Sequence, residues 1–205
     1  MKERKSNRLK DYDYSQNGYY FVTVCTKDRR EVFGNVVEGR MVLNRYGKIV
    51  DQCWHDLRKH YLNCSLDSFG IMPNHIHGII VIDNENTVGN GLKPFPAHGL
   101  SEIMRGFKTF SSRKINAAGN GLKPFPTTTA KNSNSFQWQK SFYDHIIRDE
   151  ESLNRIRQYI TYNPLKWELD IENKDNHSRH KNSADYYDEI ITGGEKTQRA
   201  GEGKT

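Results

Sequence analysis

The chain has 205 residues, of which 35% are hydrophobic and 11% aromatic, enough for one globular domain with a buried core. A net charge of +6 favours an anionic partner, and nucleic acid is the obvious candidate. Cys25, Cys53 and Cys64 show no CxxC spacing, which argues against a disulfide framework and a thiolate zinc site. No apolar run approaches the roughly 18 to 20 residues of a membrane span, so we expect a cytoplasmic protein without a membrane partner.

The first half of the chain predicts a strand, a helix and two further strands. After a basic arm at residues 1–17, residues 18–26 are rich in aromatic and β-branched side chains, which predicts a central strand. Apolar side chains recur at helical spacing between residues 44 and 62, which predicts a helix covering a sheet. Residues 64–72 and 75–82 predict two antiparallel strands joined by a hairpin, because Pro73-Asn74 is a turn signal.

The second half predicts two helices and one strand between loops. The octapeptide Gly-Asn-Gly-Leu-Lys-Pro-Phe-Pro occurs at residues 89–96 and again at 119–126, which predicts inserted loops at 84–97 and 117–135. Residues 98–116 predict a second covering helix, and residues 136–147 a strand and turn. Asp149 predicts the N-cap of a helix that Pro164 ends. We place the domain at residues 18–167 and expect a polar, partly disordered tail at 168–205.

The motif His75-Ile-His77 is the part of the sequence that most strongly suggests a metal-binding or catalytic site. Because side chains alternate along a strand, both imidazoles lie on one face and can bind one metal ion together. Such a pair taken alone is more often two ordinary, partly buried histidines. A metal site therefore requires a third ligand, and an enzyme requires a nucleophile.

Tyr159 and Asn163 stand four residues apart at the margin of the apolar stripe of the last predicted helix. This spacing places a phenol and an amide oxygen side by side on one helix. The amide suits a third metal ligand, and the phenol suits a nucleophile. The residues alone equally allow a tyrosine that packs at the helix margin and an asparagine that ends the helix before proline.

Four blocks, in this order, resemble the single-tyrosine HUH transposases, and among them the REP-associated tyrosine transposases. The blocks are Met-Pro-Asn-His75-Ile-His77, Leu-Ser-Glu-Ile-Met-Arg-Gly-Phe-Lys-Thr-Phe, Trp138-Gln with Phe-Tyr-Asp-His145-Ile-Ile-Arg148, and Tyr159-Ile-Thr-Tyr-Asn163-Pro. The resemblance covers about residues 18–167. It implies an α+β fold, a ferredoxin-like antiparallel sheet with helices on one face.

The resemblance also implies roles for individual residues. His75 and His77 would bind a divalent metal, Mg²⁺ or Mn²⁺, with Asn163 in the place of a polar metal ligand, and Tyr159 would attack DNA. Tyr143 is the rival nucleophile, and we rank it lower because it lies in the strand-and-turn block and not on the helix. Further candidates for contacts with DNA or with the metal ligands are His145, Arg148 and Lys108.

These roles predict a metal-dependent single-stranded DNA endonuclease and strand transferase, acting on single-stranded or hairpin DNA as a monomer or homodimer. Attack by Tyr159 on a phosphodiester would yield a covalent phosphotyrosine and a free 3′-hydroxyl, so the strand can be rejoined without ATP. A histidine-triad nucleotide hydrolase is disfavoured, since Ile79 stands where a third histidine would be expected. The other alternative is a non-catalytic hairpin-DNA-binding protein derived from a transposase.

Overall fold

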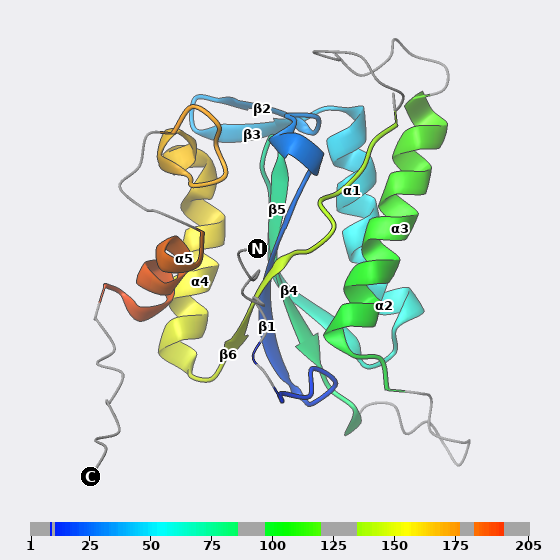
Figure 1. The fold of residues 1–205 in the computed structure, drawn as a ribbon, viewed down its shortest axis with the longest axis vertical. Helices are drawn as coiled ribbons and strands as arrows, with labels where there is room; N and C mark the ends of the chain where they lie inside the picture. Colours follow the sequence, from blue (N-terminus) through cyan, green and yellow to red (C-terminus); the bar gives the residue numbers. More distant parts are fainter. Residues whose placement is uncertain (1–8, 10, 86–96, 120–134, 177–182, 195–205) are drawn as a thin grey trace, which may run out of the picture.

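A four-stranded antiparallel sheet with the order β4-β5-β1-β6 forms the centre of the molecule (Figure 1). The inner strands are β1 (Gly18–Cys25) and β5 (His75–Ile82), and the edge strands are β4 (Cys64–Ile71) and β6 (Tyr143–Ile147). The central position predicted for residues 18–26 and the predicted hairpin are both confirmed. The computed structural model describes residues 9, 11–85, 97–119, 135–176 and 183–194. Most of the predicted arm and loops, including the octapeptides apart from Gly119, lie outside these residues.

Helices cover both faces of this sheet (Figure 1). On one face lie α1 (Arg45–His55), α2 (Leu57–His60) and α3 (Leu100–Gly119), and on the other lie α4 (Glu150–Tyr162) and α5 (Ser183–Thr192). The α+β fold with an antiparallel sheet is confirmed, but its helices occupy two faces where one was predicted. The reason is that β1 is apolar on both sides: Tyr20 and Val22 face the first core, and Phe21 faces the second.

Local sequence signals set several element boundaries. The Asn44 side chain accepts hydrogen bonds from the backbone N–H groups of Tyr46 and Gly47 and so begins α1. The helix predicted over residues 44–62 breaks at Asp56 into α1 and α2. As predicted, Asp149 caps α4, accepting a hydrogen bond from the Ser152 backbone N–H at 2.7 Å.

Short elements connect the main ones. The 3-10 helix η1 (Lys27–Arg29) follows β1, and a separate two-stranded sheet consists of β2 (Gly34–Val37) and β3 (Arg40–Leu43). The strand predicted over residues 136–147 is regular only from Tyr143, and the segment before it makes one bridge, between Thr26 and Trp138. After α4 the chain continues through Pro164 as the 3-10 helix η3 (Asn163–Leu169).

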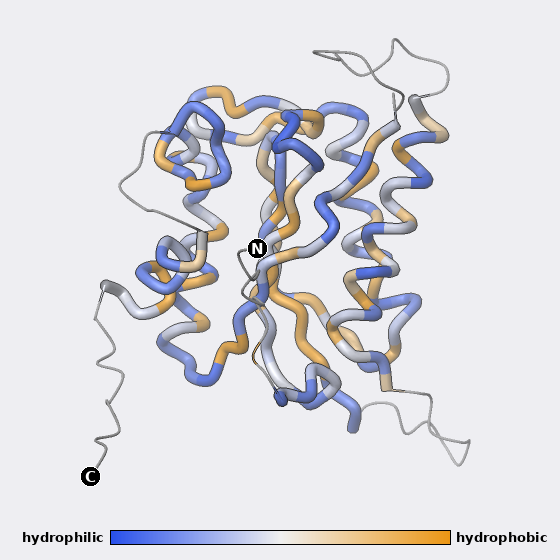
Figure 2. Tube along the Cα trace, in the orientation of Figure 1, coloured by the Kyte–Doolittle hydropathy of each residue, from blue (hydrophilic) through white to orange (hydrophobic). Residues whose placement is uncertain are grey.

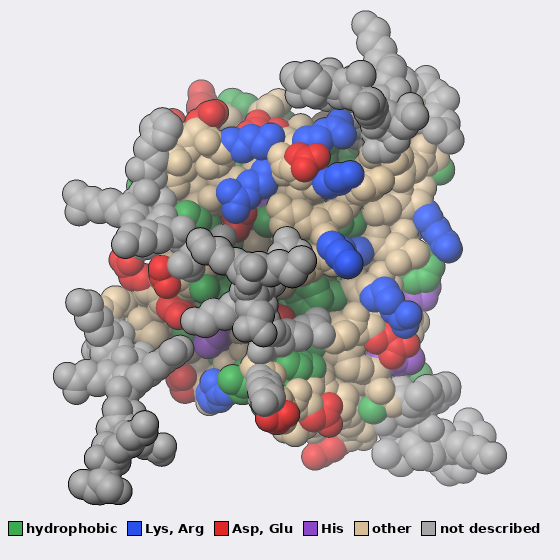
Figure 3. Space-filling model, viewed as in Figure 1, with side chains coloured by type: hydrophobic (Ala, Val, Ile, Leu, Met, Phe, Trp, Pro, Cys, Tyr) green, Lys and Arg blue, Asp and Glu red, His purple; other side chains and the backbone are tan. Residues whose placement is uncertain are grey.

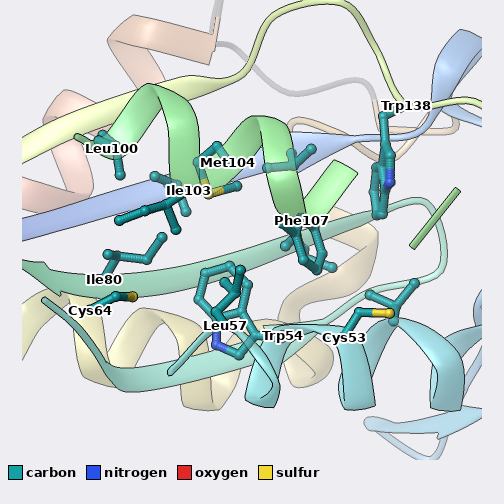
Figure 4. Packing of buried hydrophobic residues seen from close by; sticks show 14 of the residues in the cluster. Cys53, Trp54, Leu57, Cys64, Ile80, Leu100, Ile103, Met104, Phe107 and Trp138 are labelled. Carbon is teal, nitrogen blue, oxygen red and sulfur yellow. The ribbon is translucent and has the colours of Figure 1, made fainter. Parts of the chain in front are cut away.

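The core on the α1–α3 face is built around Trp54. Its ring stacks on Phe69 with centroids 4.5 Å apart and meets the edge of Phe107 at 5.5 Å. Figure 4 shows Trp54 beside Leu57 and Phe107, between the sheet and the helices. Apolar residues are concentrated along the strands (Figure 2), as expected for a sheet covered on both faces.

The chain after residue 167 packs onto the α4 face. Asp170 and Tyr187 are fully buried, and Ile191 of α5 belongs to the same apolar cluster as Ile156 and Ile160 of α4. The predicted domain boundary at residue 167 therefore leaves out side chains that the second core uses. No helix in the described ranges is long and apolar enough to cross a membrane.

We predict that Gly78→Ala destabilises the fold by about 1–3 kcal/mol, the usual effect of overpacking a core. A Cβ atom at Gly78 would lie 2.3 Å from Cζ2 of the buried Trp54, which cannot move without disturbing Phe69 and Phe107. Denaturant unfolding followed by tryptophan fluorescence measures the change. Gly70→Ala is the matched control on β4, because its Cβ would lie farther from its neighbours, 3.1 Å from Cγ2 and 3.4 Å from the backbone oxygen of Ile160. Equal stability of the Gly78 variant and wild type would contradict the prediction.

Candidate functional site

His75 and His77 lie on the α4 face of β5, where both rings are fully buried. Their Nε2 atoms are 2.8 Å apart. The alternation of side chains along β5 therefore brings two ring nitrogens to one point, as the motif predicted. At this separation, two nitrogen lone pairs repel each other unless a proton or a cation lies between them.

Asn74 fixes the tautomer of His75. The amide nitrogen of Asn74 donates to the backbone carbonyls of Glu172, at 2.8 Å, and Arg29, at 3.4 Å, so its Oδ1 is available as an acceptor. The His75 Nδ1–H donates to this oxygen at 2.7 Å, which leaves the lone pair on Nε2. Burial and the neighbouring His77 lower the pKa of His75 to about 3. The His75 ring is therefore neutral near pH 7 and suited to bind a metal.

Thr23 holds the ring of His77 from the adjacent strand. The two residues are register partners on β1 and β5, and Thr23 Oγ1 lies 2.9 Å from His77 Nδ1. A hydroxyl can accept as well as donate, so Thr23 is compatible with a proton on Nδ1. In that tautomer, His77 Nε2 is free to bind a metal.

Asp170 is the third member of the site, and the sequence analysis missed it. Its Oδ2 lies 3.9 Å from each histidine Nε2, and its Oδ1 accepts the backbone N–H of Glu172 at 2.7 Å. Burial opposes ionisation of Asp170, but the two histidines and the Asn163 amide outweigh it and lower the pKa of the carboxyl below its ordinary value. The only sequence signal was an acidic residue seven positions after Asn163.

The side chains of His75, His77 and Asp170 fit a divalent cation. Their candidate ligand atoms all lie within 4.8 Å of one another. Two ligands about 2.1 Å from one ion are about 3 Å apart when they meet at a right angle, close to the separation of the two Nε2 atoms. A cation would also offset the buried negative charge of Asp170. Two nitrogens and one carboxylate oxygen are ligands typical of first-row transition ions.

Asn163 lies beside Asp170 at the end of α4. Its amide nitrogen donates to Asp170 Oδ2 at 2.6 Å. Its Oδ1 is buried and has no hydrogen-bond partner among the residues that the structure describes. An unpaired buried carbonyl oxygen costs about 1–3 kcal/mol, so a ligand at this position would stabilise it. The role of Asn163 as a metal ligand stays a prediction.

Tyr159 points from α4 toward the same three residues. Its hydroxyl lies 3.0 Å from His77 Nε2 and donates a hydrogen bond to Asp170 Oδ2 at 3.1 Å. Burial and the Asp170 carboxylate raise the pKa of Tyr159 well above its ordinary value, so the phenol is neutral near pH 7. Tyr159 and Asn163 are therefore adjacent at the site, as their spacing on the helix predicted.

Tyr143 shares this face of the sheet but not these contacts. Its ring packs against Tyr187 with centroids 4.5 Å apart, and burial raises the pKa of its phenol. In the described part of the chain, no hydrogen bond joins its hydroxyl to His75 or His77.

The other three candidates lie outside the histidine cluster. His145 pairs with Phe21 in the sheet, and burial lowers its pKa. Arg148 is exposed between β6 and α4. Lys108 belongs to α3 on the opposite face of the sheet, where its Nζ donates to the backbone carbonyls of Gln139 and Lys140.

Two proteins of Haemophilus influenzae are similar to this chain over most of its length. An uncharacterized protein of Haemophilus influenzae is 39% identical over 169 residues, which cover 82% of this chain and 91% of that protein. A second protein of that organism, provisionally named a REP-associated tyrosine transposase, is 22% identical over 155 residues, covering 75% of this chain and 74% of its own.

Two solved structures are also similar. One is a REP-associated tyrosine transposase bound to a REP hairpin, with 19% identity and a TM-score of 0.48, covering 78% of this chain and 74% of that one. The other is a provisionally assigned transposase of Deinococcus radiodurans, with 17% identity and a TM-score of 0.44, covering 75% and 95%.

The family model of IS200-like transposases matches residues 14–163. This range includes both histidines, Tyr159 and Asn163, and it ends before Asp170. The match spans most of the 205 residues and agrees with the order of the four sequence blocks. The chain therefore belongs to the family of IS200-like transposases.

Proposed function

We propose that this protein is a metal-dependent single-stranded DNA endonuclease and strand transferase with Tyr159 as its nucleophile. The observation that carries the proposal is the position of the Tyr159 hydroxyl, 3.0 Å from His77 Nε2 and 3.1 Å from Asp170 Oδ2. A phenol beside a candidate metal site is placed to attack a phosphate that the same metal polarises. The geometry favours Tyr159 over Tyr143.

In this proposal His75, His77 and Asp170 hold the metal, and Asn163 orients Asp170 or adds its free oxygen to the ligands. A bound divalent ion would supply Lewis-acid polarisation of the phosphate and a positive charge that favours the phenolate. The nitrogen ligands favour Mn²⁺ or another transition ion on affinity, whereas Mg²⁺ is the more abundant candidate.

The remaining steps centre on Tyr159. Its phenol gives up its proton to solvent, because Asp170 stays ionised to hold the metal, and the phenolate oxygen forms a bond to phosphorus. The bond from phosphorus to the 3′ oxygen breaks, and this oxygen takes up a proton from solvent to become a free 3′-hydroxyl. Attack of a 3′-hydroxyl on the phosphotyrosine reverses the sequence and joins a strand without ATP.

The substrate we propose is single-stranded or hairpin DNA. A net charge of +6 suits a phosphate backbone, and membership of a transposase family makes DNA the expected polymer. A phosphate in an unpaired strand can reach the partly buried Tyr159 more easily than one in a duplex. Both histidines and Tyr159 come from one chain, so the proposed site does not require a second subunit to complete it.

Tyr159→Phe is expected to abolish the covalent DNA adduct, because only the phenol oxygen can form the bond to phosphorus. The measurement is a denaturing gel of protein incubated with labelled hairpin oligonucleotides from the flanks of its own gene, with and without Mn²⁺. Wild type should give a metal-dependent band at the combined mass of the protein and the DNA fragment that lies 3′ of the cleaved bond.

Tyr143→Phe is the matched control for this experiment, since it removes one hydroxyl from the same face of the sheet. It should retain the adduct. Loss of the adduct only in Tyr143→Phe would reassign the nucleophile to β6. Tight binding of hairpin DNA by wild type without any adduct would favour the non-catalytic alternative.

The third metal ligand can be identified by comparing Asp170→Ala with Asn163→Ala. We expect Asp170→Ala to weaken Mn²⁺ binding by more than about 100-fold and Asn163→Ala by about 10- to 100-fold, the usual effect of losing a residue that supports a ligand. Calorimetry of the DNA-free protein measures both affinities, with circular dichroism to verify folding. A larger loss in Asn163→Ala would identify the amide as the ligand in place of the carboxylate.

Thr23 is expected to position His77 for metal binding. Thr23→Val removes the hydroxyl but keeps the branched shape, and we predict a loss of Mn²⁺ affinity of about 10- to 100-fold. Thr23→Ser restores the hydroxyl and should bind nearly as well as wild type. Titration of free Mn²⁺, followed by electron paramagnetic resonance without DNA, separates this role from an effect on the reaction. Equal affinity of the Val and Ser variants would show that the hydrogen bond is unimportant.

A further inference from the structure

A partly buried ion pair links two segments that are distant in sequence. Nη2 of Arg29, in η1, lies 2.8 Å from Oε2 of Glu172, and the exposed fractions of the two side chains are 38% and 5%. We propose that this ion pair positions two of the three candidate metal ligands, His75 and Asp170, an inference that rests on the proposed metal site. Glu172 lies outside the group of described residues that could hold the ion, so its role is to position ligands and not to be one.

The backbone of Glu172 contacts the supports of both ligands. Its N–H donates to Asp170 Oδ1 at 2.7 Å, while Asp170 Oδ2 lies on the side of the histidines. Its carbonyl accepts a hydrogen bond from the Asn74 amide nitrogen at 2.8 Å, and Asn74 Oδ1 accepts the His75 Nδ1–H. A displacement of Glu172 would therefore move the carboxylate ligand and disturb the contact that fixes the tautomer of His75.

Arg29 contacts the same amide from another segment. Its backbone carbonyl accepts from the Asn74 amide nitrogen at 3.4 Å, so this group donates to the carbonyls of both Arg29 and Glu172. The side chains of these two residues then join in the ion pair. Arg29 also has a left-handed backbone, with a φ of 50°, which is uncommon for a residue other than glycine. Such a conformation persists where the surrounding contacts hold it in place.

The position of Glu172 depends on its charged partner because its carboxylate is buried. A buried charge that loses its counter-ion is strongly destabilising. The hydroxyl of Tyr187 lies 3.5 Å from Glu172 Oε1, at the limit of a hydrogen bond, whereas the contact with Arg29 is 2.8 Å. Without the Arg29 cation we therefore expect the segment around Glu172 to shift toward solvent, where the carboxylate can be hydrated. Asp170, two residues earlier, would move with it.

An alternative role for Arg29 is to supply positive charge for a phosphate. Figure 3 shows several Lys and Arg side chains at the end of the molecule where η1 lies in Figure 1, so positive charge there does not require Arg29. The guanidinium of Arg29 contacts a buried carboxylate, whereas Lys27 of the same short helix contacts the exposed Gln137, at 3.2 Å. Lys27 is therefore a matched control for Arg29.

The direction of the effect on metal affinity separates positioning from electrostatics. Arg29 is close enough to the site that its charge adds to burial and to His77 in lowering the pKa of His75. If charge alone acts, removing a positive charge so near a cation site should tighten metal binding. Loss of positioning should instead weaken it.

The test compares Mn²⁺ affinity in Arg29→Met, Arg29→Lys and Lys27→Met with that of wild type, in the full chain without DNA. Calorimetry measures the affinity, and circular dichroism verifies folding. Met keeps a long side chain without the charge, and we expect Arg29→Met to weaken binding by about tenfold or more. Lys supplies a cation that can restore a single contact, so Arg29→Lys should bind nearly as well as wild type. Lys27→Met should not weaken binding.

A double variant, Arg29→Met with Glu172→Gln, serves if Arg29→Met fails to fold because Glu172 keeps an unpaired buried charge. The double variant has no such charge. Positioning predicts a loss of about tenfold or more in this variant too, since the contact is absent. Electrostatics alone predicts an affinity close to that of wild type, because the two charges removed are opposite in sign.

The tautomer of His75 gives a second measurement that needs no metal. Nitrogen NMR of histidine-labelled, metal-free protein reports which ring nitrogen carries the proton, and the His75 signal is identified by its absence in His75→Gln. Wild type should carry the proton on Nδ1. Arg29→Met, or the double variant in its place, should shift toward exchange between both tautomers, whereas Lys27→Met should match wild type.

Two results would overturn the inference. One is Mn²⁺ binding by Arg29→Met, or by the double variant in its place, that equals or exceeds that of wild type, and the other is an equal loss in Lys27→Met. A wild type that binds no Mn²⁺ would instead reject the proposed metal site. The His75 signal would then decide, since a tautomer change absent from Lys27→Met supports the positioning role and an unchanged tautomer overturns it.

Discussion

The alternation of side chains along β5 is the constraint on which the site depends. One face of the strand presents Ile76 and Gly78 to the core around Trp54, and the other presents His75 and His77 to α4. A slip of one residue would exchange the two faces and bury both imidazoles among apolar side chains. The close approach of Trp54 to Gly78 opposes such a slip, because no other residue type leaves room for the indole ring. The packing of Trp54 against one face of β5 thus keeps His75 and His77 on the other face.

The second requirement is the position of α4, which brings Tyr159 over the histidines. The apolar side of the helix packs on the sheet through Ile156 and Ile160. On its flank, Arg157 makes two hydrogen bonds to the carboxylate of Asp67 on β4, at 3.0 Å and 2.7 Å. This paired contact defines the rotation of the helix as well as its distance, because a guanidinium and a carboxylate meet in one plane. Together these contacts aim Tyr159 at the site.

The parts of the site that sequence could predict are those that local periodicity determines. Period two puts His75 and His77 on one face, and a spacing of four puts Tyr159 beside Asn163. Asp170 follows Pro164 in a segment without periodicity, and only contacts distant in sequence turn its carboxylate toward the histidines. Local periodicity also could not predict that helices cover the second face of the sheet, because a strand that is apolar on both sides does not reveal which segment covers each side. Lys108 was a candidate for contact with DNA or with the metal ligands, and its backbone carbonyl partners became visible only in the structure.

The charges at the site connect metal binding to the proposed nucleophile. Asp170 is buried and ionised, and its negative charge is one reason why the pKa of Tyr159 lies well above its ordinary value. A second negative charge on the phenol, 3.1 Å away, would be strongly disfavoured beside a fully buried carboxylate. A divalent cation held by Asp170 and the histidines reverses the sign of this effect, because it neutralises the carboxylate and attracts the phenolate. Without metal, Asp170 would thus keep Tyr159 protonated and inactive. With metal, Asp170 would help to bind the cation whose positive charge activates Tyr159.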